Sequence, residues 1–304
     1  MGNFGMQYSN KRRVNLESRD LRVLEFLWRW KLASTSAIGA KFFNLNLKNA
    51  YNRLNDLERA EVVEIRSDEK LKRFAWAITQ KGFKAIRDEL PALREEGFRS
   101  EHIHHDFLVT AFHLGDWLVS IPEGAKLFSE QQLRRLLIDD YPAWIPKTEI
   151  HRPDGYWGLP GSDKIVPVAL EVEIHRKGPA SYEVLGEFYS DQNEIFRVIW
   201  LVPSVAAARR IQSKFRQTTT IRNNIHNFIL IPNFVNHGWL CPIVLGPETG
   251  KTLSDFLHSV PGEKPVKRGE TFTAQHLLNT KKSFVRSRHL HEIQKSPKAL
   301  LSTV

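Results

Sequence analysis

The segment IFRVIWLVP, residues 195–203, constrains the fold more than any other, because it is apolar almost throughout. A strand of this kind is typical of the centre of a parallel sheet, where both faces are buried. Helical patterns are predicted on either side of it, over residues 179–193 and 204–217. We therefore expect an α/β region built around this strand.

Further strands are predicted around the apolar segment. Residues 149–158 and 164–176 read as a strand pair joined by the turn GLPGSD, and shorter strands are predicted at 125–129 and 226–232. A helix over 100–118 precedes them, and a small helix is predicted at 130–137. With the small helix set aside, the order begins helix, strand, strand, strand, helix, strand.

The first ninety residues have a different pattern. Apolar residues at helical spacing predict three helices, over 18–32, 34–43 and 46–60. Two short strands, 62–65 and 73–78, follow on either side of the charged turn RSDEK, and a fourth helix is predicted over 79–90. This order resembles a winged helix-turn-helix, which implies binding of double-stranded DNA. The alternative is a protein-interaction module with the same fold.

Polar side chains on the third helix and the hairpin are the candidates for DNA contact, because they can reach base edges and phosphates. A short basic arm, residues 11–13, precedes the first helix. The candidate residues are Lys48, Asn49, Asn52 and Arg53 on the helix and Arg66, Lys70, Lys72 and Arg73 on the hairpin.

The charge of the chain divides it into three parts. Residues 1–95 hold 19 Lys and Arg against 12 Asp and Glu, residues 96–259 hold 16 against 19, and residues 260–304 hold 9 against 3. Basic ends suit a phosphate backbone, and an acidic middle suits a site for divalent cations. We expect an N-terminal DNA-binding domain (1–95), a second domain (96–259) and a basic tail (260–304).

Three acidic residues are expected to converge in the second domain. Glu171 and Glu173 are two apart on a predicted strand, so they share a face at a spacing of about 7 Å. Asp154 lies on the neighbouring strand. Without compensating bases these carboxylates would repel one another, and Mg²⁺ or Mn²⁺ would relieve that repulsion. The alternative is that Glu171 and Glu173 form a solvated strand face.

The stretches HRPDG (151–155) and LEVEIHRK (170–177) resemble the site of PD-(D/E)XK nucleases. That resemblance implies a nuclease-like αβββαβ domain, with Asp154, Glu171 and Glu173 as metal ligands. Glu173 stands where the motif has lysine, so Lys177 or His175 is the candidate replacement, and we count Lys177 among the catalytic candidates. Four histidines of residues 100–118 lack a zinc-site spacing and are expected to be partly buried or capping.

The whole arrangement is similar to the replication-relaxation family of plasmid and mobile-element proteins. The resemblance covers roughly residues 18–216 and includes SEQQLRRL (129–136) and ALEVEIHRKGPASYEVLGEFY (169–189). It implies a role in replication or mobilisation of such DNA, with Mg²⁺-dependent nicking as one expectation. The other is a non-enzymatic transcription or replication regulator whose nuclease-like domain serves in homodimer formation or partner binding. A third reading is a purely protein-binding adaptor.

The sequence also limits where the protein acts. No run approaches the roughly 18 apolar residues of a membrane helix, and the first fifteen residues lack the apolar core of a secretory signal. Cys241 is the single cysteine, so an internal disulfide and a cysteine zinc cage are excluded. We expect a cytoplasmic protein without membrane contact.

Overall fold

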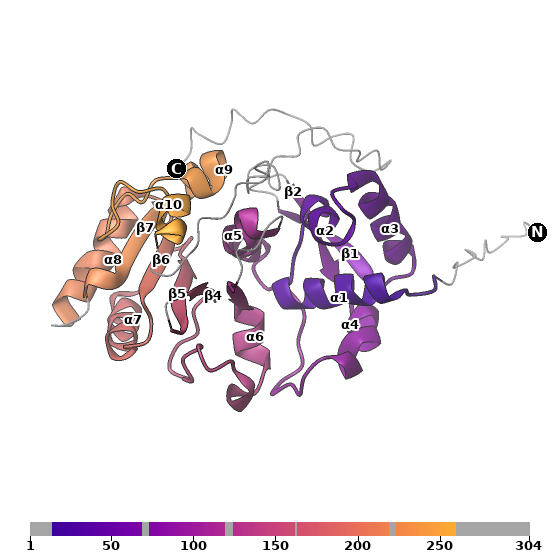
Figure 1. Cartoon of the computed structure of the whole chain (residues 1–304), viewed down its shortest axis with the longest axis horizontal. Helices are drawn as coiled ribbons and strands as arrows, with labels where there is room; N and C mark the ends of the chain where they lie inside the picture. The colour runs from indigo at the N-terminus through magenta and orange to yellow at the C-terminus, as the bar shows by residue number, and fades with distance from the viewer. Residues whose placement is uncertain (1–13, 69–72, 119–123, 162, 219–222, 260–304) are drawn as a thin grey trace, which may run out of the picture.

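The computed structural model describes residues 14–68, 73–118, 124–161, 163–218 and 223–259. Within them the chain forms a helical N-terminal region followed by a five-stranded mixed sheet with helices on both faces (Figure 1). The coarse prediction of a mixed α/β protein with these two parts is confirmed. The residues 11–13, Lys70, Lys72 and the tail 260–304 lie outside the described residues.

In the N-terminal region, the described residues between 18 and 90 form four α-helices and one hairpin. Its elements are α1 (Ser18–Trp30), α2 (Thr35–Phe42), α3 (Leu47–Arg59), β1 (Val63–Asp68), β2 (Arg73–Ile78) and α4 (Gln80–Ile86). The strands pair antiparallel, with Val63 opposite Ile78. Side chains of Ser34, Asn46 and Thr79 cap α2, α3 and α4 by accepting backbone N–H bonds, which explains where these helices begin.

The sheet has the order β3-β4-β5-β6-β7. The pairs β3–β4 and β4–β5 are antiparallel, and β5–β6 and β6–β7 are parallel. The strands are β3 (Lys126–Ser129), β4 (Gly155–Pro160), β5 (Ile165–Val172), β6 (Arg197–Val202) and β7 (His226–Leu230). The apolar segment at 195–203 thus supplies β6, which lies between two parallel neighbours.

Helices cover both faces of this sheet. Buried residues of α7 and α8 pack with Ala169 on one face, whereas those of α5, α9 and α10 pack with Val168 and Leu170 on the other (Figure 1). The helices are α5 (Ile103–Leu114), α6 (Glu130–Arg135), α7 (Pro179–Asp191), α8 (Val205–Thr218), α9 (Ile231–His237) and α10 (Leu253–His258). Short 3₁₀ turns lie at Arg87–Glu89, Gly115–Leu118, Ile138–Asp140, Asn223–Ile225 and Gly238–Leu240.

The N-terminal region and the sheet share buried surface. One cluster of buried apolar residues runs from Leu24 and Leu27 on α1 through Phe128 and Leu133 to Trp200 on β6. The boundary expected at residue 95 therefore falls between segments that pack against each other.

Two strand ends differ from the sequence expectation, and both differences position the acidic residues. β4 begins at Gly155 rather than near 149, because Pro153 lacks a backbone N–H and Gly155 has φ 155°. A Cβ at Gly155 would lie 2.2 Å from Cε1 of His113. β5 ends at Val172, so Glu173 follows the strand. Asp154 and Glu173 consequently lie just outside the two strands.

Candidate functional site

The three predicted acidic residues lie at the neighbouring ends of β4 and β5. Gly155 pairs with Leu170 across β4 and β5, and the Asp154 N–H donates to the Leu170 carbonyl at 3.0 Å. This register places Asp154 beside the end of β5 that carries Glu171. Glu171 and Glu173 are only 3% and 4% exposed, so they are not a solvated strand face.

Glu171 is held by two donors. The His151 Nε2–H donates to Oε1 of Glu171 at 2.6 Å, and the Tyr189 hydroxyl of α7 donates to the same oxygen. Burial, followed by the charge of Glu171, raises the pKa of Tyr189 well above its usual value, so this hydroxyl stays protonated. The His151 ring packs edge-on against Phe188, with centroids 5.1 Å apart. Glu171 therefore has a fixed orientation.

Glu173 pairs with the predicted lysine replacement. Nζ of Lys177 lies 3.0 Å from Oε2 of Glu173. Burial raises the pKa of Glu173, and the nearby ammonium partly offsets this. Burial alone would lower the pKa of Lys177, but Glu171, Glu173 and Asp154 raise it. Lys177 thus stays charged and is acted on by the charges of all three predicted ligands, whereas His175, the other candidate replacement, is exposed.

Asp154 is held by His105, one of the four histidines that were expected to be partly buried or capping. Its Oδ2 accepts the Val172 N–H at 2.6 Å, and Nε2 of His105 lies 3.4 Å from its Oδ1. The same Nε2 lies 3.1 Å from the Val172 carbonyl oxygen. Burial would raise the pKa of Asp154, but the His105 charge and the Val172 N–H together lower it.

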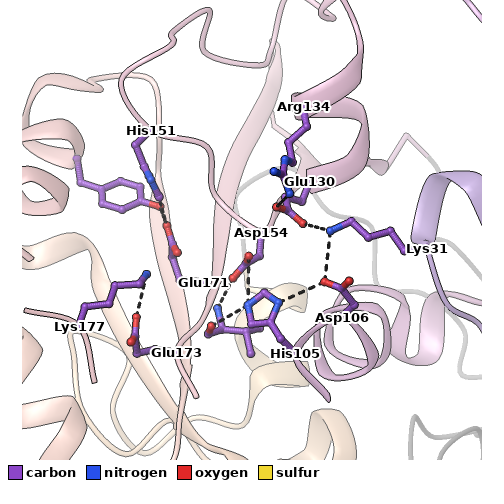
Figure 2. A network of polar contacts seen from close by, with 12 residues as sticks. Lys31, His105, Asp106, Glu130, Arg134, His151, Asp154, Glu171, Glu173 and Lys177 are labelled. Atoms are coloured by element: carbon purple, nitrogen blue, oxygen red, sulfur yellow. Dashed lines mark hydrogen bonds and ion pairs between the residues drawn. The ribbon is translucent and has the colours of Figure 1, made fainter. Parts of the chain in front are cut away.

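A chain of charges links His105 to the N-terminal region (Figure 2). Nδ1 of His105 lies 3.4 Å from Oδ1 of Asp106, which lies 3.3 Å from Nζ of Lys31. That ammonium lies 2.6 Å from Oε2 of Glu130 at the start of α6, and Arg134 lies 3.6 Å from the other oxygen of Glu130. Lys31 follows α1 directly and has φ 60°. The site is therefore continuous with the end of α1.

The candidate DNA-contacting residues divide into two groups. Lys48, Asn49 and Asn52 are exposed on α3, which lies on the side of the N-terminal region turned away from the sheet (Figure 1). Arg53 instead points to α1, where its Nε donates to Oδ1 of the buried Asp20 at 3.0 Å. This ion pair is structural.

On the hairpin, Arg66 pairs with Glu64 on the same strand at 3.1 Å, with both side chains partly exposed. Arg73 begins β2, and its side chain is outside what the structure describes. The hairpin candidates thus remain predictions.

The acidic set has the right chemistry for Mg²⁺ or Mn²⁺ but not the right arrangement. Hard divalent cations prefer carboxylate oxygens. Within the described residues, however, no group of three or more His, Cys, Asp and Glu is placed to hold a metal ion. Asp154, Glu171 and Glu173 are each turned to a basic partner, namely His105, His151 and Lys177. In this arrangement the residues do not fit a divalent cation.

Two histidines of α5 differ in role: His113 is buried in the core, as the sequence indicated, and His105 is a partner of Asp154, which the sequence did not indicate. His113 is fully buried, donates from Nε2 to the Tyr156 carbonyl at 3.0 Å and has a pKa lowered by burial to about 3. This agrees with the expectation of buried histidines. His105 belongs to the site, but its partner Asp154 is far away in sequence, so no local pattern signals the pairing. His151 stands inside the HRPDG motif, which could have identified it.

Comparisons with family models, with curated proteins and with solved structures give no match for this chain. A search of the described helices finds none with the length and apolar character needed to cross a bilayer.

Proposed function

We propose that this chain binds double-stranded DNA through α3 and the β1–β2 hairpin. The observation that carries the proposal is the exposed row of Lys48, Asn49 and Asn52 on one helix, directly ahead of a hairpin. Polar side chains on an exposed helix suit the major groove, and a hairpin can lie along the adjacent backbone. The element order from α1 to β2 is typical of a winged helix-turn-helix.

Anisotropy titrations of a labelled duplex test the proposal. We expect affinity to fall steeply with salt, and we expect Lys48→Ala to reduce the slope of log K against log salt by about one. Lys164→Ala, which removes an exposed lysine from the β4–β5 turn, is the matched control. Salt-independent binding, or none, would point to the protein-binding adaptor instead.

We propose that the second region, residues 96–259, serves in homodimer formation or partner binding and does not cleave DNA. The order from α5 to β6 supports a nuclease-like αβββαβ fold, and the resemblance to replication-relaxation proteins supports regulation of plasmid or mobile-element DNA. The pairing of each acidic residue with a basic side chain favours the non-enzymatic alternative. It predicts that duplex binding is unaffected by EDTA and by Glu171→Ala. The homodimer that this alternative includes stays a prediction, which sedimentation velocity can test.

Metal-dependent nicking is the second candidate, and one observation favours it. Lys177 lies 3.0 Å from Glu173, the residue at the lysine position of the nuclease motif, and the charges of Asp154 and Glu171 also act on it. Cleavage would need Asp154 and Glu171 to leave their histidine partners. Supercoiled plasmid incubated with Mg²⁺ or Mn²⁺ tests this candidate. Nicking by the wild type that Asp154→Ala abolishes would establish this candidate. Equal amounts of supercoiled plasmid left by the wild type and by Asp154→Ala would exclude it.

A further inference from the structure

The first half of α3 presents two asparagines and one lysine on the face turned away from the sheet (Figure 1). Asn49 and Asn52 are both exposed, and because they are three residues apart on a helix their side chains are neighbours on its surface. Neither side-chain amide has a hydrogen-bond partner among the residues that the structure describes. The exposed Lys48 lies beside them. This surface therefore offers two amides whose donors and acceptors are available to a ligand.

The two arginines of α3 are engaged elsewhere. The Arg53 Nε–H donates to Oδ1 of the buried Asp20 at 3.0 Å, and its terminal nitrogen donates to the Asn15 carbonyl at 3.0 Å. Arg59 stands in the last turn of the helix, where its guanidinium lies 2.8 Å from Oδ1 of Asp56. Base edges are contacted by the N-terminal residues of a recognition helix. That half of α3 therefore has no guanidinium directed outward.

The side chains that remain differ in the base they match. An asparagine amide can donate to N7 of adenine while its oxygen accepts from the N6 amino group, so the pair forms two hydrogen bonds in the major groove. Guanine presents two acceptors, N7 and O6, which are matched by the donors of arginine or lysine. Lys48 is the side chain of this face that suits a phosphate, as the salt dependence expected above requires.

We propose that Asn49 and Asn52 each read an adenine, so that this chain prefers duplexes with adenines at two neighbouring positions of the segment that α3 contacts. The inference rests on the proposed binding of DNA by α3 and names the bases that the helix selects. It follows from the ion pair between Arg53 and Asp20, which leaves the amides as the base-reading groups.

Sequencing the duplexes that the full chain retains from a library with a randomised core tests the preference. We expect adenine to be enriched at two neighbouring positions. Replacing either adenine by 7-deazaadenine, which keeps the base pair but lacks the N7 acceptor, should weaken binding about tenfold. Replacing a guanine of the same duplex by 7-deazaguanine should leave the affinity unchanged.

Two variants assign the contacts to residues. Asn49→Ala and Asn52→Ala should each bind the enriched duplex about tenfold more weakly than the wild type. Each should also become insensitive to 7-deazaadenine at one of the two positions, and the two variants should differ in which position that is. Asn236→Ala, which changes an exposed asparagine of α9, is the matched control and should keep the affinity and the sensitivity of the wild type.

Three outcomes would overturn the inference: guanine is enriched instead of adenine, 7-deazaadenine does not weaken binding, or both variants keep the sensitivity of the wild type at both positions. Equal, salt-dependent binding of all duplexes in the library would also overturn it but would leave the proposed DNA binding intact. Absence of binding to any duplex would overturn the proposed function itself. The two failures are therefore distinguishable.

Discussion

The protonated ring of His105 should make the stability of this protein fall as pH rises, and His105→Gln tests that expectation. Burial alone would lower the pKa of His105, but the carboxylates of Asp154 and Asp106 more than offset burial and raise the pKa to about 11. The side chain is 21% exposed, so solvent screens these interactions only in part. In the folded protein the ring therefore stays charged at neutral pH.

The direction and size of the effect follow from proton linkage. An unfolded histidine has a pKa of about 6.5, so above that pH the folded protein holds one proton more than the unfolded chain. The stabilisation is fully present below about pH 6.5 and is lost as the pH rises toward 11. The slope is about 1.4 kcal/mol per pH unit, which gives about 2 kcal/mol between about pH 7 and about pH 8.5.

Urea unfolding followed by tryptophan fluorescence measures this effect, with EDTA present to exclude metal. Over that pH range the wild type should lose about 2 kcal/mol more unfolding free energy than His105→Gln does. His102→Gln, which changes an exposed histidine before α5, should follow the wild type. Parallel pH dependences for the wild type and His105→Gln would refute the assignment of a charged, ion-paired His105.

Three further substitutions separate structural charges from DNA-contacting ones. Lys31→Met removes the cation from two carboxylates and should lower the unfolding free energy in urea by about 3–5 kcal/mol. Asp20→Ala removes the buried partner of Arg53 and should cost about 2 kcal/mol in the same assay. Lys48→Ala should change stability by less than about 0.5 kcal/mol while it weakens duplex binding in anisotropy titrations. An unchanged unfolding free energy for Lys31→Met or for Asp20→Ala would contradict the structural assignment of that residue. A clearly lowered unfolding free energy for Lys48→Ala would contradict its assignment as an exposed contact residue.

The fold could be predicted from sequence wherever the periodicity is strong. The apolar segment at 195–203 indicated a strand buried on both faces, and β6 has parallel partners on both sides. The helices and the hairpin of the N-terminal region were also visible, because their apolar spacing and caps are local. Strand ends were less predictable. Alternation does not reveal that Pro153 and Gly155 delay β4, or that β5 ends before Glu173.

The candidate site could be predicted only in part. The neighbouring positions of Asp154, Glu171 and Glu173 at the ends of β4 and β5 followed from strand pairing, and Lys177 is near enough in sequence to be considered. A metal ion was expected because these carboxylates would repel one another without basic partners, but His105, His151 and Lys177 supply such partners. His105 and Lys31 enter the site from segments that pack together only in three dimensions, so the sequence could not reveal them.

Arg53 shows a related limit of helical periodicity. It borders the buried stripe of α3 that contains Ala50, Leu54 and Leu57, so its side chain can turn outward or toward α1. The sequence assigned it to the outward face with Lys48. The buried carboxylate of Asp20 attracts the guanidinium toward α1. Because Asp20 is 33 residues away in sequence, the periodicity of α3 does not reveal this partner.

The position of Lys31 bears on whether DNA binding could reorganise the acidic cluster. Lys31 follows α1, and its side chain is 9% exposed between Asp106 of α5 and Glu130 of α6. Any movement of the N-terminal region against the sheet would separate these ions and expose the apolar cluster that both parts share. Leaving a buried charge unpaired costs about 3–5 kcal/mol, and exposing the shared apolar cluster would add to this cost. A duplex held by α3 and the β1–β2 hairpin, as proposed, is therefore expected to leave Asp154 and its histidine in place, which is consistent with the proposed non-cleaving role.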